Sequence, residues 1–150
     1  MLLEEKLEQD IKVALLGGDS QKATRLRGLK AALLNIKVAT GKRESGLSDD
    51  EVIDCFVKEA KKRQESADLY TQGGNQERAN LELEEKKIIE GYLPEKISEE
   101  ELIKIIDEAI KQTGASEIKD MGKVIGIVKS KTGASAEGSS VAKLTKERLQ

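Results

Sequence analysis

Apolar residues recur at intervals of three and four along almost the whole chain, and this periodicity limits the fold more than any other feature. Leu3, Leu7, Ile11 and Leu15 begin the pattern, which is that of a helix with one buried face. No segment alternates apolar and polar residues as a half-buried strand does. The sequence therefore predicts an all-α protein.

Capping residues and glycines divide the periodic pattern into helices. Ser48 with Glu51, and Ser98 with Glu101, have the spacing of a capping box. Ser139 or Ser140 is predicted to cap the last helix. The predicted helices cover about residues 3–16, 21–39, 49–72, 76–93, 99–113, 120–131 and 140–149.

Pro94 is the only proline, and it disfavours a helical conformation at the residue before it. We therefore place a domain boundary there. Residues 1–94 are predicted to form an N-terminal domain of four long helices, and residues 95–150 a small C-terminal domain of three helices. Only Phe56, Tyr70 and Tyr92 are aromatic, so the core is expected to consist of many aliphatic contacts between packed helices.

The composition excludes several classes of function. Histidine is absent, which removes the commonest general base, Ser-His-Asp triads and His metal ligands. A single cysteine, Cys55, allows no internal disulfide and fits a cytoplasmic, reducing compartment. No apolar run is long enough to cross a bilayer, and Glu4 and Glu5 argue against a signal peptide. We expect no catalytic residue, cofactor or metal.

Three local patterns are better explained by structure than by chemistry. The glycines of residues 133–140 have P-loop spacing but lack its lysine. Gly122 and Gly126, four residues apart, are expected to let another helix approach closely. Cys55 stands beside Phe56 on an apolar helix face and is expected to be a small buried residue.

Basic residues are unevenly distributed in a chain whose net charge is −2. The segment from Ser20 to Arg43 has no acidic residue and seven basic ones: Lys22, Arg25, Arg27, Lys30, Lys37, Lys42 and Arg43. A second acid-free stretch carries Lys123, Lys129 and Lys131. Either acidic helix faces neutralise these cations within the fold, or the cations contact phosphates.

The helix over residues 21–39 carries apolar residues on one stripe and small ones on the other side. Leu26, Leu29 and Leu33 form the stripe, and Gly28 and Ala31 lie roughly opposite. This distribution favours packing on both faces, with basic side chains reaching out at the edges.

Four stretches together resemble the YqeY, or GatB/YqeY, family over essentially the whole chain. Residues 25–35 resemble its R-x-L-x-x-L-x-A-A-L-x-N helix, and residues 58–66 its K-x-R-x-x-S stretch. Tyr92-Leu93-Pro94 precedes an acidic helix start, and residues 120–126 are followed by Ala136-Glu137-Gly138. Ser135 stands where the family often has an arginine, and Glu137 where it often has an aspartate.

This resemblance implies an all-helical protein of two parts. It also implies a relationship to the tail of the B subunit of the glutamine-dependent aminoacyl-tRNA amidotransferase, and in that enzyme the tail helps hold misacylated tRNA. The chemistry of that enzyme belongs to other domains, so we expect a non-catalytic accessory protein that binds tRNA and not DNA. The candidate tRNA-binding residues are Lys123, Lys129, Lys131, Arg25, Arg27 and Lys30. Two alternatives remain: a module that docks on amidotransferase subunits or another partner, and, by kinship alone, a carbon-nitrogen ligase with glutamine as amido donor.

Overall fold

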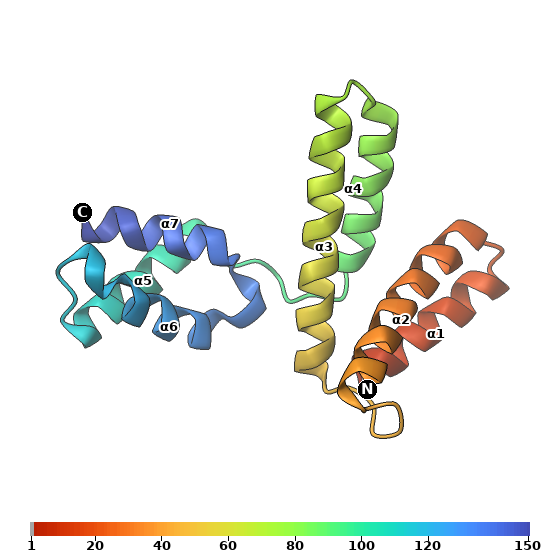
Figure 1. The fold of residues 1–150 in the computed structure, drawn as a ribbon, viewed down its shortest axis with the longest axis horizontal. Coiled ribbons are helices and arrows are strands. Elements are labelled where there is room, and N and C mark those ends of the chain that lie inside the picture. Colours follow the sequence, from red (N-terminus) through yellow and green to blue (C-terminus); the bar gives the residue numbers. More distant parts are fainter. Residues whose placement is uncertain (1) are drawn as a thin grey trace. The chain divides into compact units, whose positions relative to one another are not determined.

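The structure is a computed structural model that describes residues 2–150. Helices account for all regular structure in this range, and no strand occurs in it (Figure 1), which confirms the predicted all-α class. The elements are α1 (Leu3–Leu16), α2 (Ser20–Thr40), α3 (Asp49–Gln72), α4 (Gln76–Glu90), α5 (Glu99–Thr113), a 3-10 turn (Ile118–Asp120), α6 (Met121–Thr132), a second 3-10 turn (Gly133–Ser135) and α7 (Gly138–Leu149). None of the helices within residues 2–150 has the length and apolar content of a bilayer span.

Local capping signals set most of the helix ends. The Ser48 hydroxyl accepts from the Glu51 backbone N–H at 3.3 Å, and the Glu51 carboxylate accepts from the Ser48 backbone N–H. At the start of α5 the Ser98 hydroxyl accepts from the Glu101 backbone N–H at 3.2 Å. Gly41 ends α2 with φ of 70°, a left-handed conformation that glycine adopts without steric cost.

Two predicted helix ends are wrong. α4 ends at Glu90, three residues before Leu93, because Tyr92 turns inward and packs against Phe56. α7 begins at Gly138, so both Ser139 and Ser140 lie inside its first turn and neither is the N-cap residue. Glu137 stands at the N-cap position without a side-chain bond to the helix. The Glu137 carboxylate instead accepts from Lys96 Nζ at 2.7 Å.

The chain separates into two compact units, of which the first ends at Leu93. In this unit α1 pairs with α2, and α3 pairs with α4 (Figure 1). The largest fully buried side chain of the core is Phe56. Beyond that core, buried Ala67 of α3 and Ala79 of α4 let the two helices continue side by side. The core residues are Leu7, Ile11, Leu26, Leu29, Leu33, Leu47, Val52, Cys55, Phe56, Ala60, Ile89 and Tyr92.

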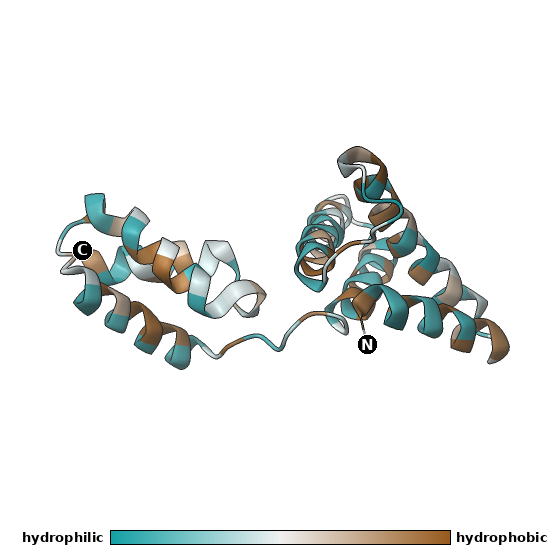
Figure 2. Cartoon of the chain, turned by 90° about the horizontal axis from the view of Figure 1, so that it is seen from below, coloured by the Kyte–Doolittle hydropathy of each residue, from teal (hydrophilic) through white to brown (hydrophobic). Residues whose placement is uncertain are grey.

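The second unit, Pro94–Gln150, has its own core from α5, α6 and α7. That core is entirely aliphatic and contains Leu102, Ile106, Ala109, Val124, Val128, Val141, Leu144 and Leu149. Teal and brown residues alternate around the helices in Figure 2, as expected of amphipathic helices. Thr145 is the single buried polar residue that accompanies this core, at 0% exposure.

Replacing Thr145 by valine is expected to stabilise the protein. The Thr145 hydroxyl is buried and has no hydrogen-bond partner within the described chain. A buried hydroxyl without a partner loses its hydration, and valine has the same shape without that penalty, so the expected gain is about 1–2 kcal/mol. Urea denaturation followed by circular dichroism measures it. Thr132→Val is the matched control, because the Thr132 hydroxyl bonds Val128 O at 2.9 Å, and this change should bring no gain.

Candidate nucleic-acid interface

The basic segment of α2 lies against acidic residues of α1. Lys30 Nζ is 2.6 Å from Glu8 Oε1, and Lys37 Nζ is 2.5 Å from Glu4 Oε1. The two carboxylates lie about one turn apart on α1 and the two cations about two turns apart on α2, and the long lysine side chains bridge the difference. The face that α2 turns toward α1 is therefore electrically compensated.

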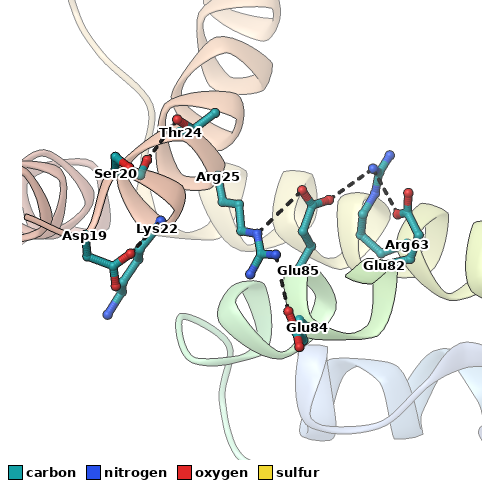
Figure 3. A network of polar contacts seen from close by, with 9 residues as sticks. All are labelled: Asp19, Ser20, Lys22, Thr24, Arg25, Arg63, Glu82, Glu84 and Glu85. Atoms are coloured by element: carbon teal, nitrogen blue, oxygen red, sulfur yellow. Dashed lines mark hydrogen bonds and ion pairs between the residues drawn. The ribbon is translucent and has the colours of Figure 1, made fainter. Parts of the chain in front are cut away.

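Arg25 and Arg63 belong to a network with three glutamates of α4 (Figure 3). Arg25 Nη2 is 3.3 Å from Glu84 Oε2, and its Nε is 4.0 Å from Glu85 Oε1. Arg63 Nη1 is 3.3 Å from Glu85 Oε2 and 3.1 Å from Glu82 Oε2. Glu85 thus lies between two guanidinium groups and connects α2, α3 and α4.

Four of the seven basic residues between Ser20 and Arg43 therefore have a carboxylate partner, since Lys42 Nζ also lies 2.7 Å from Glu51 Oε2. Among the candidate tRNA-binding residues of this segment, Arg25 and Lys30 are therefore neutralised within the fold, which is one of the two interpretations given for it. Arg27 is exposed, and no carboxylate of residues 2–150 lies within ion-pair distance of it. Of the N-terminal candidates, only Arg27 keeps an uncompensated charge.

The candidates of the second unit have a different environment. Lys123, Lys129 and Lys131 are exposed on α6, and none of them lies within ion-pair distance of a described carboxylate. The backbone N–H groups of Ser116 and Glu117 lower the pKa of the Asp120 carboxyl, and the charges of Lys119 and then Lys123 add to this effect. A Cβ built on Gly138 would lie 3.9 Å from Cε and Nζ of Lys129, so this side chain reaches the start of α7. The positive charge of this unit is therefore accessible to an external anion.

Gly122 and Gly126 were predicted to let another helix approach, and that prediction is wrong for the described chain. Both glycines are exposed, and a Cβ at either would meet no atom within 4 Å. At about 100° per residue, Lys129 and Lys123 flank them, whereas Lys131 lies about 140° or more away from both. The structure thus groups two of the three lysines beside two exposed glycines, and we call this side of the helix the glycine face of α6.

Lys143 and Lys146 of α7 are basic residues that the sequence analysis did not select. Both are exposed and form no ion pair with the residues that the structure describes. The signal that could have found them is an acid-free run between Glu137 and Glu147. They add to the uncompensated positive charge of the second unit.

A depression of about 320 Å³ near the starts of α5 and α7 is a less suitable anion site. Lys96 and Lys143 line it, but so do Glu99 and Glu137. The Lys96 ammonium is already 2.7 Å from the Glu137 carboxylate. Equal numbers of opposite charges give this depression no preference for phosphate.

The only cysteine is placed as a core residue, as predicted. Cys55 is 5% exposed, and burial, followed by the nearby Glu59 charge, raises the pKa of its thiol. A raised pKa keeps the thiol protonated and so lowers its nucleophilicity. No group of three or more Cys, Asp or Glu side chains among residues 2–150 is arranged to hold a metal ion.

Comparison with known proteins identifies one family for this chain. No curated protein matches the chain significantly. The family model described as "Yqey-like protein" matches residues 4–149, which includes both compact units. Because that match spans nearly the whole sequence, the chain belongs to the YqeY family.

Proposed function

We propose that the protein is a non-catalytic, tRNA-binding accessory factor linked to translation, and that its second unit contacts RNA phosphates through Lys123, Lys129 and Lys131. The observation that carries this proposal is the glycine face of α6 with its flanking lysines. Two exposed glycines without side chains let a sugar-phosphate backbone come close to the helix, and the exposed ammonium groups beside them supply the attraction.

The absence of aromatic residues from the second unit favours folded RNA over single strands. Phe56, Tyr70 and Tyr92 all belong to the first unit. Proteins that bind single strands stack bases on aromatic side chains, and this unit has none to offer. Recognition of helical RNA by shape and backbone needs mostly lysine and arginine.

Arg25, Arg27 and Lys30 have a secondary place in this proposal. Arg25 and Lys30 would have to give up their contacts with Glu84 and Glu8 to bind a phosphate. Arg27 needs no such exchange. The family relationship supports the choice of tRNA, because the YqeY module resembles the amidotransferase tail that helps hold misacylated tRNA.

We also infer that the two compact units are separate domains, one with α1 to α4 and one with α5 to α7. Each has its own core, and Pro94 stands at the boundary. A domain with its own core is expected to unfold as a unit. Denaturation probed separately in each unit tests this inference, as described in the Discussion.

Charge reversal at the glycine face is expected to weaken tRNA binding. The double substitution Lys123→Glu with Lys129→Glu should lower the affinity for folded tRNA by about tenfold or more, and should reduce the salt slope of log K by about two, because each lost phosphate contact removes close to one unit. Fluorescence anisotropy at about 50 and 200 mM salt measures both quantities. Single-stranded DNA of equal charge serves as the competitor.

The control variant makes the same change of net charge on another helix of the same unit. Lys104 and Lys111 of α5 are exposed and form no ion pair with a described carboxylate. Lys104→Glu with Lys111→Glu should therefore leave the salt slope nearly unchanged. If both double variants weaken binding equally, only net charge matters and the glycine face is not the site. The pair Lys129→Glu and Lys131→Glu then shows whether the far side of α6 contributes.

A further inference from the structure

Two ion pairs connect α1 and α2 and show which residues of these helices face each other. The helices are joined by a short turn and lie side by side (Figure 1). Glu4 pairs with Lys37, and Glu8 pairs with Lys30 at 2.6 Å. The partner on α2 moves toward its start as the residue on α1 moves toward its end, so the two helices are antiparallel.

The next turn of each helix brings Lys12 opposite Arg27. Lys12 follows Glu8 by four residues on α1, and Arg27 precedes Lys30 by three residues on α2. Residues three or four apart lie on the same face of a helix, so Lys12 and Arg27 continue the series of the two ion pairs. Both are exposed, and neither forms an ion pair with a described carboxylate. We call Lys12 and Arg27 the cation pair.

The side of α2 that carries Arg27 is not covered by another helix of the first unit. Gly28 and Ala31 are exposed, and a Cβ at Gly28 would meet no atom within 4 Å. The expectation that α2 packs on both faces is therefore wrong for the first unit. An external group can reach the Arg27 side chain on this open side.

Two neighbouring cations without a carboxylate are unfavourable in the free protein, because like charges at neighbouring positions repel. The chain does not lack acidic residues, since it has 28 of them against 26 basic ones. Lys12 lies one turn before the end of α1, where the helix dipole favours a cation only weakly. Arg27 has no such explanation, because it lies in the interior of α2. An oxyanion from outside the chain would compensate both charges.

We propose that the cation pair binds a backbone phosphate of the same RNA that the second unit contacts. This inference rests on the proposed function, and it adds Lys12 to the residues that hold the RNA. The guanidinium of Arg27 can donate two hydrogen bonds to one phosphate, and the Lys12 ammonium supplies a point charge beside it. The axes of packed helices lie about 8–10 Å apart, so side chains of this length reach a single phosphate between them.

The lack of a carboxylate partner separates the cation pair from the other cations of α2. Arg25 and Lys30 must leave a carboxylate before they bind a phosphate, and the lost ion pair is subtracted from the gain. The cation pair loses no such contact. Phosphate contacts position a nucleic acid without reading its sequence. Contacts in both units act on one RNA molecule, so their contributions to affinity combine.

Neutralising the cation pair in the full chain is the first test. Lys12→Gln with Arg27→Gln should raise the dissociation constant for folded tRNA by about three- to tenfold. The salt slope of log K should fall by about one, because one phosphate contact is lost. Fluorescence anisotropy at about 50 and 200 mM salt measures both quantities.

The matched control removes the same charge from α3, a helix of the same unit. Lys58 and Lys61 are exposed and form no ion pair with a described carboxylate. Lys58→Gln with Lys61→Gln should leave the salt slope nearly unchanged. An equal loss of affinity in both double variants would mean that only net charge matters, and this overturns the proposal.

Charge reversal at Arg27 gives a result that partial unfolding cannot imitate. Arg27→Glu places a carboxylate opposite Lys12 and three residues before Lys30, so the series gains a third pair of opposite charge. The midpoint of urea denaturation should stay the same or rise, while the affinity for tRNA falls by about tenfold. A midpoint that falls would show that Arg27 stabilises the fold and does not face Lys12. That result, or an unchanged affinity, overturns the proposal.

Comparison with the second unit separates this inference from the proposed function. If Lys123→Glu with Lys129→Glu weakens tRNA binding and neutralising the cation pair does not, the proposed function stands and the cation pair is not a site. A wild-type chain that binds no tRNA overturns both.

A free phosphate is the other source of the same chemistry, and nuclear magnetic resonance distinguishes it from RNA. The side-chain Nε–H signal of Arg27 is assigned by its absence from Arg27→Gln. We expect this signal to shift when tRNA is added. A shift with millimolar inorganic phosphate but none with tRNA overturns the proposal.

Discussion

Replacing Phe56 by alanine is expected to lower the free energy of unfolding of the first unit by about 3–5 kcal/mol. Phe56 is 0% exposed and has the largest side chain among the fully buried residues. Its ring meets that of Tyr92 edge to face, with centroids 5.6 Å apart. The rest of this core is aliphatic apart from Tyr92 and Cys55, and the packed helices cannot fully close the space that a lost phenyl ring leaves.

Tyrosine fluorescence isolates this effect. Both tyrosines, Tyr70 and Tyr92, belong to the first unit, and the second unit has none. In urea, the fluorescence transition of Phe56→Ala should move to lower denaturant, while circular dichroism should still show the unfolding of α5 to α7 at its original midpoint. Movement of both signals together would contradict the inference of two domains.

The neighbouring residue provides a control on the same helix. Val57 is 39% exposed, so Val57→Ala removes apolar atoms from a half-solvated position. The expected loss is below about 1 kcal/mol. Equal losses at positions 56 and 57 would show that the substitution affects α3 itself and not the core beneath it.

Helix ends determined by local chemistry could be predicted from the sequence. Ser48, Ser98 and Gly41 act through bonds or dihedral angles within a few residues, so spacing alone identifies them. The end of α4 could not be predicted in this way. It depends on Tyr92 packing against Phe56, a residue of another helix. A short sequence pattern around residue 90 does not indicate a contact with a residue so far away in the chain.

The candidate site was predicted only in part, for a related reason. The sequence shows where cations concentrate, but compensation depends on residues that are distant in the chain: Arg25 meets Glu84, fifty-nine positions away. The same limit applies to the glycines of α6. Their spacing predicted a packed helix face, whereas Gly126 turned out to be exposed, because the direction of a helix face is decided by the other helices of the unit.

The folded protein is expected to lose stability steeply above about pH 10 through Tyr92. Tyr92 is 9% exposed, its hydroxyl donates to the Asp10 carboxylate, and Lys6 Nζ lies 5.3 Å from its ring centroid. Burial, and then the hydrogen bond to Asp10, raise the pKa of Tyr92 well above its ordinary value. The hydroxyl is therefore held in its neutral form in the fold.

The sign of the effect follows from which state releases its proton first. Below about pH 10 the hydroxyl is protonated in both states, so its contribution to stability is fully present. Above that value the unfolded chain ionises while the folded one does not. The free energy of unfolding should then fall by about 1.4 kcal/mol for each further pH unit, until the folded state ionises too.

Comparison with Tyr92→Phe separates this effect from the titration of lysines. The variant should be less stable than the wild type by about 1 kcal/mol at neutral pH, because it lacks the bond to Asp10. The difference between the two proteins should shrink and then reverse above about pH 10, since phenylalanine has no proton to lose. In Tyr70→Phe, where Tyr92 is the only tyrosine, tyrosinate absorbance should appear together with unfolding. Absorbance that rises near pH 10 while the helices remain intact would mean that neither burial nor Asp10 holds the proton.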